Sequence, residues 1–231
     1  MSDADIRAVV DRQVTASGAL AVHELGILTG SVRIDVAAVG ASLGGFEIKS
    51  ATDTLRRLPA QVEAYSAVLD FAAVVVTENH LRGALSIVPT WWGVAVASSD
   101  GADVAITPLR DATDNPVIHA RSLVELLWHA DAIALLDRKD AARGVRGRAR
   151  ARAWDRVVEV CTLDEIRAEV RARLRARNAP MATPCDRCGL ESCRAWSQRT
   201  TRPDGRAFKG AADACRARAT SLPSPRPLPP G

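Results

Sequence analysis

The spacing of hydrophobic and polar positions changes character about halfway along the chain. In the first half, short runs rich in Ile, Val and Ala alternate with segments of helical period, which predicts a mixed α/β domain. The expected order is a helix at 5–14, strands at 33–40 and 45–50 that form a hairpin, a helix from Pro59, a strand at 71–76, a helix at 79–87, and strands at 89–99 and 103–109.

After about residue 120 the strand patterns stop and only helical spacing remains. Apolar residues predict helical regions at 123–136, 154–160 and 163–174, with a Gly-containing segment between the first two. Beyond Asn178 the chain is rich in Cys, Pro, Ser and Arg, and its last ten or so residues cannot form a core. We therefore expect an α/β domain at 1–115, a basic all-helical module at 116–178 and a Cys/Pro/Arg-rich tail at 179–231.

The charge is divided unevenly between these parts. Residues 1–137 hold 9 Lys and Arg against 17 Asp and Glu, residues 138–178 hold 13 against 6, and residues 179–231 hold 9 against 4. An acidic first part followed by basic parts is typical of an acidic metal site joined to a nucleic-acid-binding region. A solvated, Arg-rich helical face is the alternative explanation of the same charges.

Membrane association and secretion are not expected. The longest apolar runs, such as 71–76, are far too short to span a bilayer, and the N-terminus lacks the basic-then-apolar order of a secretory signal. The sequence predicts a cytoplasmic protein without a membrane partner. Its oligomeric state stays open, a dimer included.

The expected hairpin places three charged residues together. Side chains alternate between faces along a strand, so Glu47 and Lys49 share the face opposite Phe46 and Ile48. On the preceding strand Asp35 lies opposite the set Ile34, Val36 and Ala38, and the hairpin brings it beside Glu47 and Lys49.

Two carboxylates and an ammonium on a mostly buried sheet are costly to desolvate unless something compensates them. Mg²⁺ (or Mn²⁺) does so, because it prefers oxygen ligands and takes one or two carboxylates together with waters and phosphate oxygens. Such a cation activates water and offsets charge on a phosphate, while Lys49 orients that water or stabilises the transition state. The alternative is a solvent-facing sheet with an ordinary cross-strand ion pair.

These residues resemble the motif of the PD-(D/E)xK nuclease superfamily. Asp35 on one strand and Glu47-Ile48-Lys49 on the next match it, although Ile34 stands where the namesake Pro would be. The segment 20–98 is most similar to small stand-alone bacterial members of the MmcB or VRR-NUC kind, in which an Asp and a Tyr-containing helix follow, as Asp53 and Tyr65 do here. The resemblance implies a restriction-endonuclease-like fold and hydrolysis of phosphodiester bonds.

Two further positions are similar to features of that superfamily. Many members carry an upstream Glu that contacts the metal, which implies a metal set of Glu24, Asp35 and Glu47; a helix-end or loop carboxylate is the alternative for Glu24. Some members carry a Gln in the following helix, which implies a catalytic set of Asp35, Glu47, Lys49 and Gln61. Arg56 and Arg57 are weaker candidates for phosphate contacts, as are Trp91 and Trp92 for base stacking.

The basic module and the tail carry two more candidate sites. The segment around 134–159 resembles, in outline, a SAP-like helix-turn-helix that grips a DNA backbone. Four cysteines in the tail have a spacing that permits a structural Zn²⁺, whereas a disulfide set is not expected in the cytosol: Cys185, Cys188, Cys193 and Cys215.

Taken from the sequence, the expected function is a Mg²⁺-dependent nuclease acting on DNA in repair, mobile-element maintenance or defence. Two alternatives stay open. One is a nuclease-fold protein without catalysis that binds nucleic acid or regulates, and the other is an unrelated α/β protein whose cysteines bind zinc for protein contacts.

Overall fold

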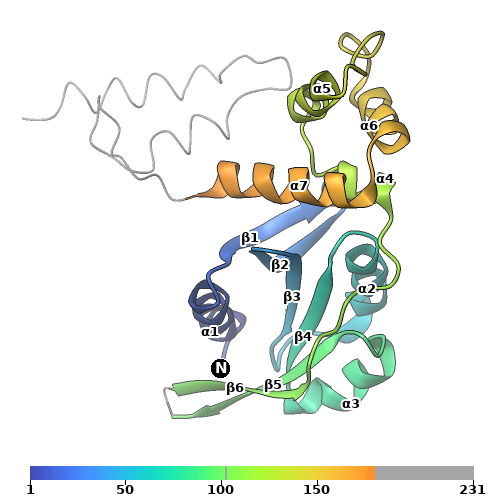
Figure 1. Cartoon of the computed structure of the whole chain (residues 1–231). Helices are drawn as coiled ribbons and strands as arrows, with labels where there is room; N and C mark the ends of the chain where they lie inside the picture. The colour runs from blue at the N-terminus through green and yellow to red at the C-terminus, as the bar shows by residue number, and fades with distance from the viewer. Residues whose placement is uncertain (102, 180–231) are drawn as a thin grey trace, which may run out of the picture. The chain divides into compact units, whose positions relative to one another are not determined.

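A computed structural model of the chain describes residues 1–101 and 103–179. Within them, six strands and seven helices alternate as an α/β structure, with two short 3₁₀ turns (Figure 1). The strands are β1 (Leu20–Ile27), β2 (Val32–Val39), β3 (Leu43–Lys49), β4 (Phe71–Thr77), β5 (Gly93–Asp100) and β6 (Asp103–Arg110). The helices are α1 (Asp3–Ala16), α2 (Leu58–Ser66), α3 (Glu78–Ile87), α4 (Ala120–Val124), α5 (His129–Arg138), α6 (Arg150–Val160) and α7 (Leu163–Asn178).

The six strands form one mixed sheet whose spatial order follows the sequence, from β1 to β6. The pairs β1–β2, β2–β3 and β5–β6 are antiparallel, whereas β3–β4 and β4–β5 are parallel. Parallel neighbours require crossover connections, and the helices α2 and α3 supply them. The expected mixed sheet and the hairpin of β2 and β3 are therefore confirmed.

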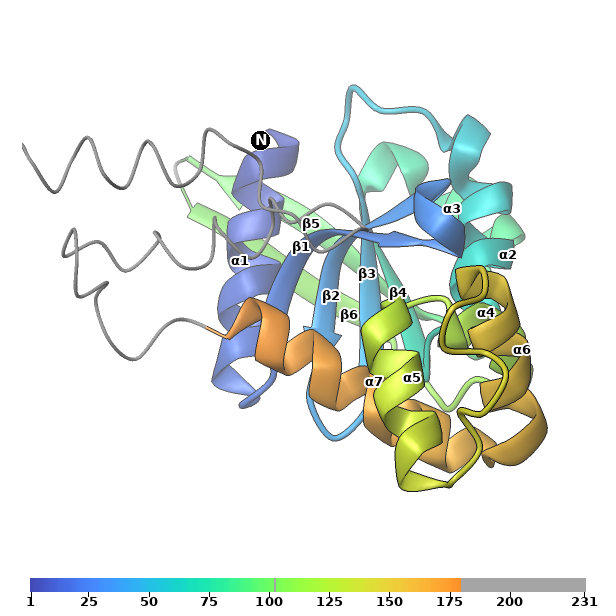
Figure 2. The same ribbon diagram turned by 90° about the horizontal axis from the view of Figure 1, so that it is seen from above.

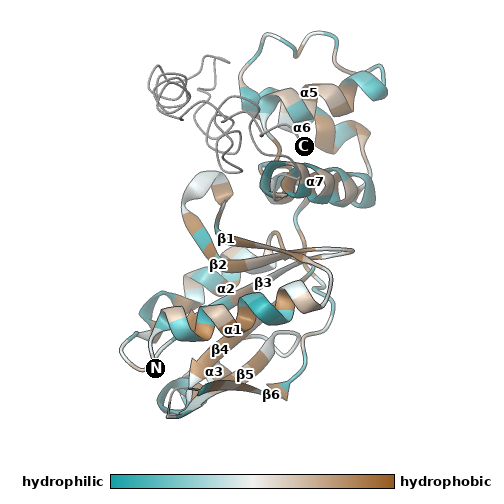
Figure 3. Cartoon of the chain, turned by 90° about the vertical axis from the view of Figure 1, so that its left-hand side faces the viewer, coloured by the Kyte–Doolittle hydropathy of each residue, from teal (hydrophilic) through white to brown (hydrophobic). Residues whose placement is uncertain are grey.

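Helices cover both faces of the sheet. On one face α1 buries Ile6, Val10 and Val14 against residues of β2 to β5, among them Ile48 and Val75. On the other face lie α2 and α3 (Figure 2). Because both faces are covered, the central strands are almost continuously apolar, as the brown colour of β4 shows (Figure 3).

The helices after residue 115 share the core of the sheet. Leu127 and Trp154 belong to the same apolar cluster as Ile34 and Val74, and residues 1–175 form one compact unit. Polar contacts add to this packing, since Arg167 pairs with Asp70 at 3.0 Å. The segment 116–175 therefore does not have an apolar core separate from that of the sheet. None of the described helices is both long enough and apolar enough to span a membrane.

Two expectations differ from the structure. The expected order contained no strand between residues 14 and 33, where β1 lies. Within β1, Glu24 has a left-handed φ of 51°, which interrupts the regular strand conformation. The strand expected at 89–99 starts only at Gly93, since Pro89 and Trp92 close a turn through a backbone hydrogen bond of 3.1 Å.

The approach of β3 to β4 gives a first prediction, because a Cβ at Gly44 would lie 2.0 Å from Cζ of Phe71. We expect Gly44→Ala to lower the free energy of unfolding by about 1–3 kcal/mol, the usual cost of overpacking. Most of this loss should disappear in a Phe71→Leu background. Urea unfolding of the four proteins measures the coupling, and Gly147→Ala, which meets nothing within 4 Å, is the control. Equal costs in both backgrounds would contradict this explanation.

Candidate active site

The central strand β3 carries two buried ions. Glu47 is 1% exposed and Lys49 4% exposed, and both contact α2, while Ile48 between them packs in the cluster under α1. Strand alternation thus places the two charges on one face, as the sequence predicted. Because α2 covers that face, the pair is buried rather than spread on an open sheet surface.

Hydrogen bonds from three side chains compensate the buried carboxylate. Oε1 of Glu47 accepts from Nζ of Lys49 at 2.5 Å and from Nε2 of Gln61 at 2.6 Å. Its Oε2 accepts from the hydroxyl of Tyr65 at 2.5 Å, and Nζ of Lys49 also donates to Oε1 of Gln61 at 3.2 Å. A buried ion pair needs such additional partners to offset its desolvation.

Asp35 stands where β2 and β3 separate. The pairing of the two strands runs from Val39–Leu43 to Val36–Phe46. One residue further, Oδ2 of Asp35 accepts a hydrogen bond of 2.8 Å from the amide of Ile48, in place of a backbone carbonyl. The side chain is 19% exposed and faces the gap that the separation opens.

The environment of Asp35 disfavours its charge. Burial and the nearby carboxylate of Glu47 raise the pKa of Asp35 to about 7, against the hydrogen bond from Ile48 and the charges of Arg7 and Lys49. Two carboxylates that face the same space repel each other unless a cation lies between them.

Asp35, Glu47, Lys49 and Gln61 line one pocket of about 630 Å³. Its wall also includes Arg33 and Arg57, both exposed. Neither guanidinium has an ion-pair partner in the described part of the chain. The pocket therefore combines an inner pair of carboxylates with free cations at its edge.

Arg7 of α1 is the main member of this site that the sequence analysis missed. Its guanidinium donates to Asp3 at 3.0 Å, to Glu24 at 2.9 Å and to the backbone carbonyl of Asp35 at 2.9 Å. It also lies 3.7 Å from Oδ1 of Asp35. A single Arg beside the apolar stripe of a helix carries no sequence signal that distinguishes it from a surface Arg.

Glu24 lies on β1 opposite Asp35, between the pairs His23–Val36 and Leu25–Ile34. Its side chain is 48% exposed and pairs with Arg7. A left-handed backbone at a non-glycine strand residue is a strained feature that redirects the side chain. The structure thus brings Glu24 to the edge of the pocket.

The described residues contain no cluster of three or more His, Cys, Asp or Glu side chains that could hold a metal ion. Asp35 and Glu47 nevertheless meet the smaller requirement of Mg²⁺, which takes one or two carboxylates and completes its shell with water and phosphate oxygens. The mutual repulsion of the two carboxylates is what a divalent cation would relieve. The residues present fit a weak, open cation site better than a closed one.

The other candidates have structural surroundings. Trp92 is fully buried and stacks on Tyr65 with ring centroids 5.5 Å apart, and Trp91 is 9% exposed, so neither ring is open to a base. Asp53 accepts hydrogen bonds from the amide and hydroxyl of Ser50, which hold the turn after β3. Cys185, Cys188, Cys193 and Cys215 lie outside the described residues.

Fold and pocket together define an α/β protein with a buried, hydrogen-bonded carboxylate–ammonium pair at the base of an open cavity. The sequence profile of the family described as Bacteriophage P4 protein cII matches residues 6–183, and the chain belongs to this family. No similar sequence was found among the curated proteins. One solved structure, of a protein of unknown function from Silicibacter pomeroyi, has 22% sequence identity to this chain and a TM-score of 0.37. The match covers 63% of this chain and 92% of that chain.

The buried pair gives a second prediction. Lys49→Met leaves the carboxylate of Glu47 without its cation, and we expect a loss of about 3–5 kcal/mol in the free energy of unfolding. Adding Glu47→Gln should recover much of this loss, because the buried charge is then gone. Chemical denaturation of both variants checks this, with Arg156→Met, which breaks an exposed pair with Glu159, as a control that changes stability by less than about 1 kcal/mol. A double variant less stable than Lys49→Met would contradict the account.

The pKa of Asp35 gives a third prediction. Between pH 4 and 7 the folded protein keeps a proton that the unfolded chain, with its ordinary pKa of 3.8, has lost. Stability should therefore fall as pH rises through this window, by up to roughly 4 kcal/mol. Asp35→Asn, whose amide oxygen can still accept from Ile48, should flatten this part of the profile. Urea unfolding with a chelator at several pH values tests this, and parallel profiles for both proteins would contradict it.

Proposed function

We propose that this protein is a metal-dependent nuclease that hydrolyses phosphodiester bonds in DNA, with a restriction-endonuclease-like site. One observation carries the proposal: a single pocket is lined by all four residues that the resemblance singled out, Asp35, Glu47, Lys49 and Gln61. Glu47 and Lys49 lie on β3, whereas Asp35 comes from β2 and Gln61 from α2. An ordinary cross-strand ion pair would not need Gln61 and Tyr65 to enclose it. A chance motif would not be expected to converge in this way.

The edge of the pocket supports a phosphate substrate. Arg33 and Arg57 have no carboxylate partner in the described ranges, so a phosphate group can pair with either guanidinium without displacing an existing ion pair. Exposed guanidiniums bind phosphate oxygens through charge-assisted hydrogen bonds. The inner carboxylates would repel such a substrate unless a cation covers them, which links substrate binding to metal binding.

Each residue then has a role. Asp35 and Glu47 would hold Mg²⁺ or Mn²⁺, and such a cation supplies water activation and offsets negative charge on the phosphate. Lys49, fixed by Glu47 and Gln61, holds an ammonium at the floor of the pocket, where it stabilises charge that develops during hydrolysis. Gln61 is a positioning residue, because it donates to Glu47 and accepts from Lys49. Glu24 would bind the metal only after its ion pair with Arg7 is broken.

A nuclease-fold protein that binds nucleic acid without cleaving it is the second candidate. The arrangement around Arg7 favours it, since a protein cation already pairs with Glu24 and lies near Asp35. Protein donors also engage both oxygens of Glu47. In this case nucleic acid would bind in a salt-dependent manner, with no turnover at any metal concentration.

A fourth prediction separates the two candidates. The purified protein should cut plasmid or single-stranded DNA with Mg²⁺ or Mn²⁺ and not with excess chelator. Asp35→Asn should lower the rate at least about 100-fold, the scale of losing one preorganised charged group. Gln61→Ala should lower it by about 10- to 100-fold, as for a residue that orients a ligand.

Arg82→Gln, an exposed change on α3 away from the pocket lining, is the control and should cut at the wild-type rate. Circular dichroism confirms that each variant is folded. Absence of cleavage across structured, single-stranded and damaged DNA, or equal rates for wild type and Asp35→Asn, would overturn the nuclease proposal.

A further inference from the structure

The guanidinium of Arg7 joins α1 to two strands at the edge of the pocket. It donates to Oε1 of Glu24 on β1 at 2.9 Å and to the backbone carbonyl of Asp35 on β2 at 2.9 Å. On its own helix it pairs with Asp3 at 3.0 Å. All four residues line the pocket that also contains Glu47. One side chain thus holds residues of three elements, which the five donors of a guanidinium allow.

Three neighbouring strands each contribute one carboxylate to this pocket. Glu24 of β1 lies opposite Asp35 of β2, and Glu47 stands on β3, the next strand of the sheet. Among the described residues they do not form a cluster that could hold a metal ion. Glu24 is the one of the three whose carboxylate accepts a hydrogen bond from Arg7. A cation of the protein therefore occupies a carboxylate that adjoins the two proposed metal ligands.

The backbone of Glu24 is strained, and the ion pair does not account for the strain. Its φ of 51° is a left-handed conformation, which is unfavourable for a residue other than glycine. The side chain is 48% exposed, and an ion pair so open to water contributes little stability. Strain that stability does not offset is typical of ligand-binding and switch positions. A ligand explains the position of Glu24 better than Arg7 alone.

We propose that the ion pair of Arg7 and Glu24 is a latch on the metal site: a divalent cation binds when Glu24 exchanges the guanidinium for the metal. This inference rests on the proposed function, because it takes Asp35 and Glu47 as the other ligands. The guanidinium lies 3.7 Å from Oδ1 of Asp35, so its charge also opposes a metal at that carboxylate.

The latch sets how much metal the pocket requires. A ligand that binds only the open form has an apparent dissociation constant larger than its intrinsic one, by the inverse of the fraction that is open. Opening does not leave Arg7 without a partner, because its ion pair with Asp3 lies within α1 and does not involve Glu24. The pocket therefore has its own cation when metal is scarce, and it releases Glu24 when metal is abundant.

The test measures binding of Mn²⁺ to the full chain without DNA, with electron paramagnetic resonance reporting the free ion. A pH of about 8 keeps Asp35, with its pKa of about 7, mostly ionised. Arg7→Met should bind Mn²⁺ about 3- to 30-fold more tightly than wild type, because the competing cation is gone. Glu24→Gln should remove most of this gain in the Arg7→Met background. In the wild-type background it should weaken binding much less, since Glu24 must there be freed before it binds.

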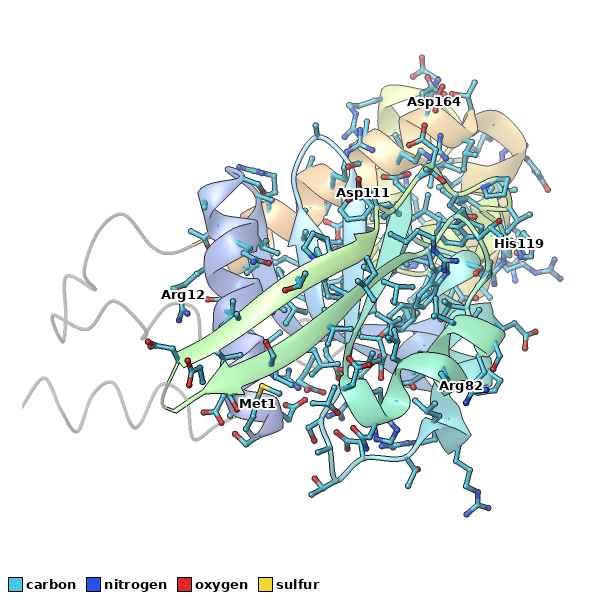
Figure 4. The ribbon with its side chains drawn as sticks, turned by 90° about the horizontal axis from the view of Figure 1, so that it is seen from below. Met1, Arg12, Arg82, Asp111, His119 and Asp164 are labelled. Atoms are coloured by element: carbon cyan, nitrogen blue, oxygen red, sulfur yellow. The ribbon has the colours of Figure 1, made fainter. Side chains whose placement is uncertain are left out.

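Arg12→Met is the matched control, because it removes the same charge from an exposed position of α1 outside the pocket lining (Figure 4). It should keep the wild-type dissociation constant within about twofold, as expected for a screened surface charge. Circular dichroism checks that each variant is folded, and Arg7→Gln takes the place of Arg7→Met if the latter is not.

An equal gain from Arg7→Met with and without Glu24→Gln would show a general charge effect and overturn the latch. Cleavage of DNA by wild type, together with an Mn²⁺ affinity that Arg7→Met leaves unchanged, would refute only the latch. The expected changes in Mn²⁺ affinity without any cleavage would refute only the nuclease proposal. If neither wild type nor Arg7→Met binds Mn²⁺, both proposals are wrong.

Discussion

The burial of a carboxylate on the central strand is the constraint around which this structure is arranged. Glu47 lies beneath α2 at 1% exposure, where an uncompensated charge would be prohibitively costly. Lys49, Gln61 and Tyr65 each give it a hydrogen bond, so the position of α2 relative to β3 is tied to this one group. Tyr65 in turn stacks on Trp92, which extends the constraint to the turn before β5.

The same constraint explains why the pocket opens where it does. A strand that continued to pair with β3 beyond Val36 would cover Glu47 from the side of β2. Instead β2 moves away, and the side chain of Asp35 accepts from the amide of Ile48, which has no backbone partner on β2 there. The separation therefore leaves this amide of β3 satisfied, and both carboxylates line one cavity.

Much of the sheet could be predicted from sequence because its signals are local. The β-branched run of β4 and the alternation of Glu47 and Lys49 with Phe46 and Ile48 depend only on neighbours in the chain. The phase of β3 therefore predicted which residues share a face. The edge strand β1 was not predicted, since it depends on pairing with β2, which is not a local signal in the sequence. Glu24 also leaves the strand conformation in its middle.

The residues of the site likewise differ in whether the sequence could reveal them. Glu47 and Lys49 were accessible from strand alternation, and Gln61 only through the resemblance to the nuclease superfamily. Arg7 depends on how α1 lies across the sheet. That residue changes the electrostatic account of the pocket. It pairs with Asp3 and Glu24, yet it reaches the carboxylate of Asp35 only at 3.7 Å, so the pKa of Asp35 stays raised. Arg7 thus neutralises Asp3 and Glu24 at the edge of the pocket and leaves Asp35 without a close cation. Added positive charge would be most favourable beside Asp35.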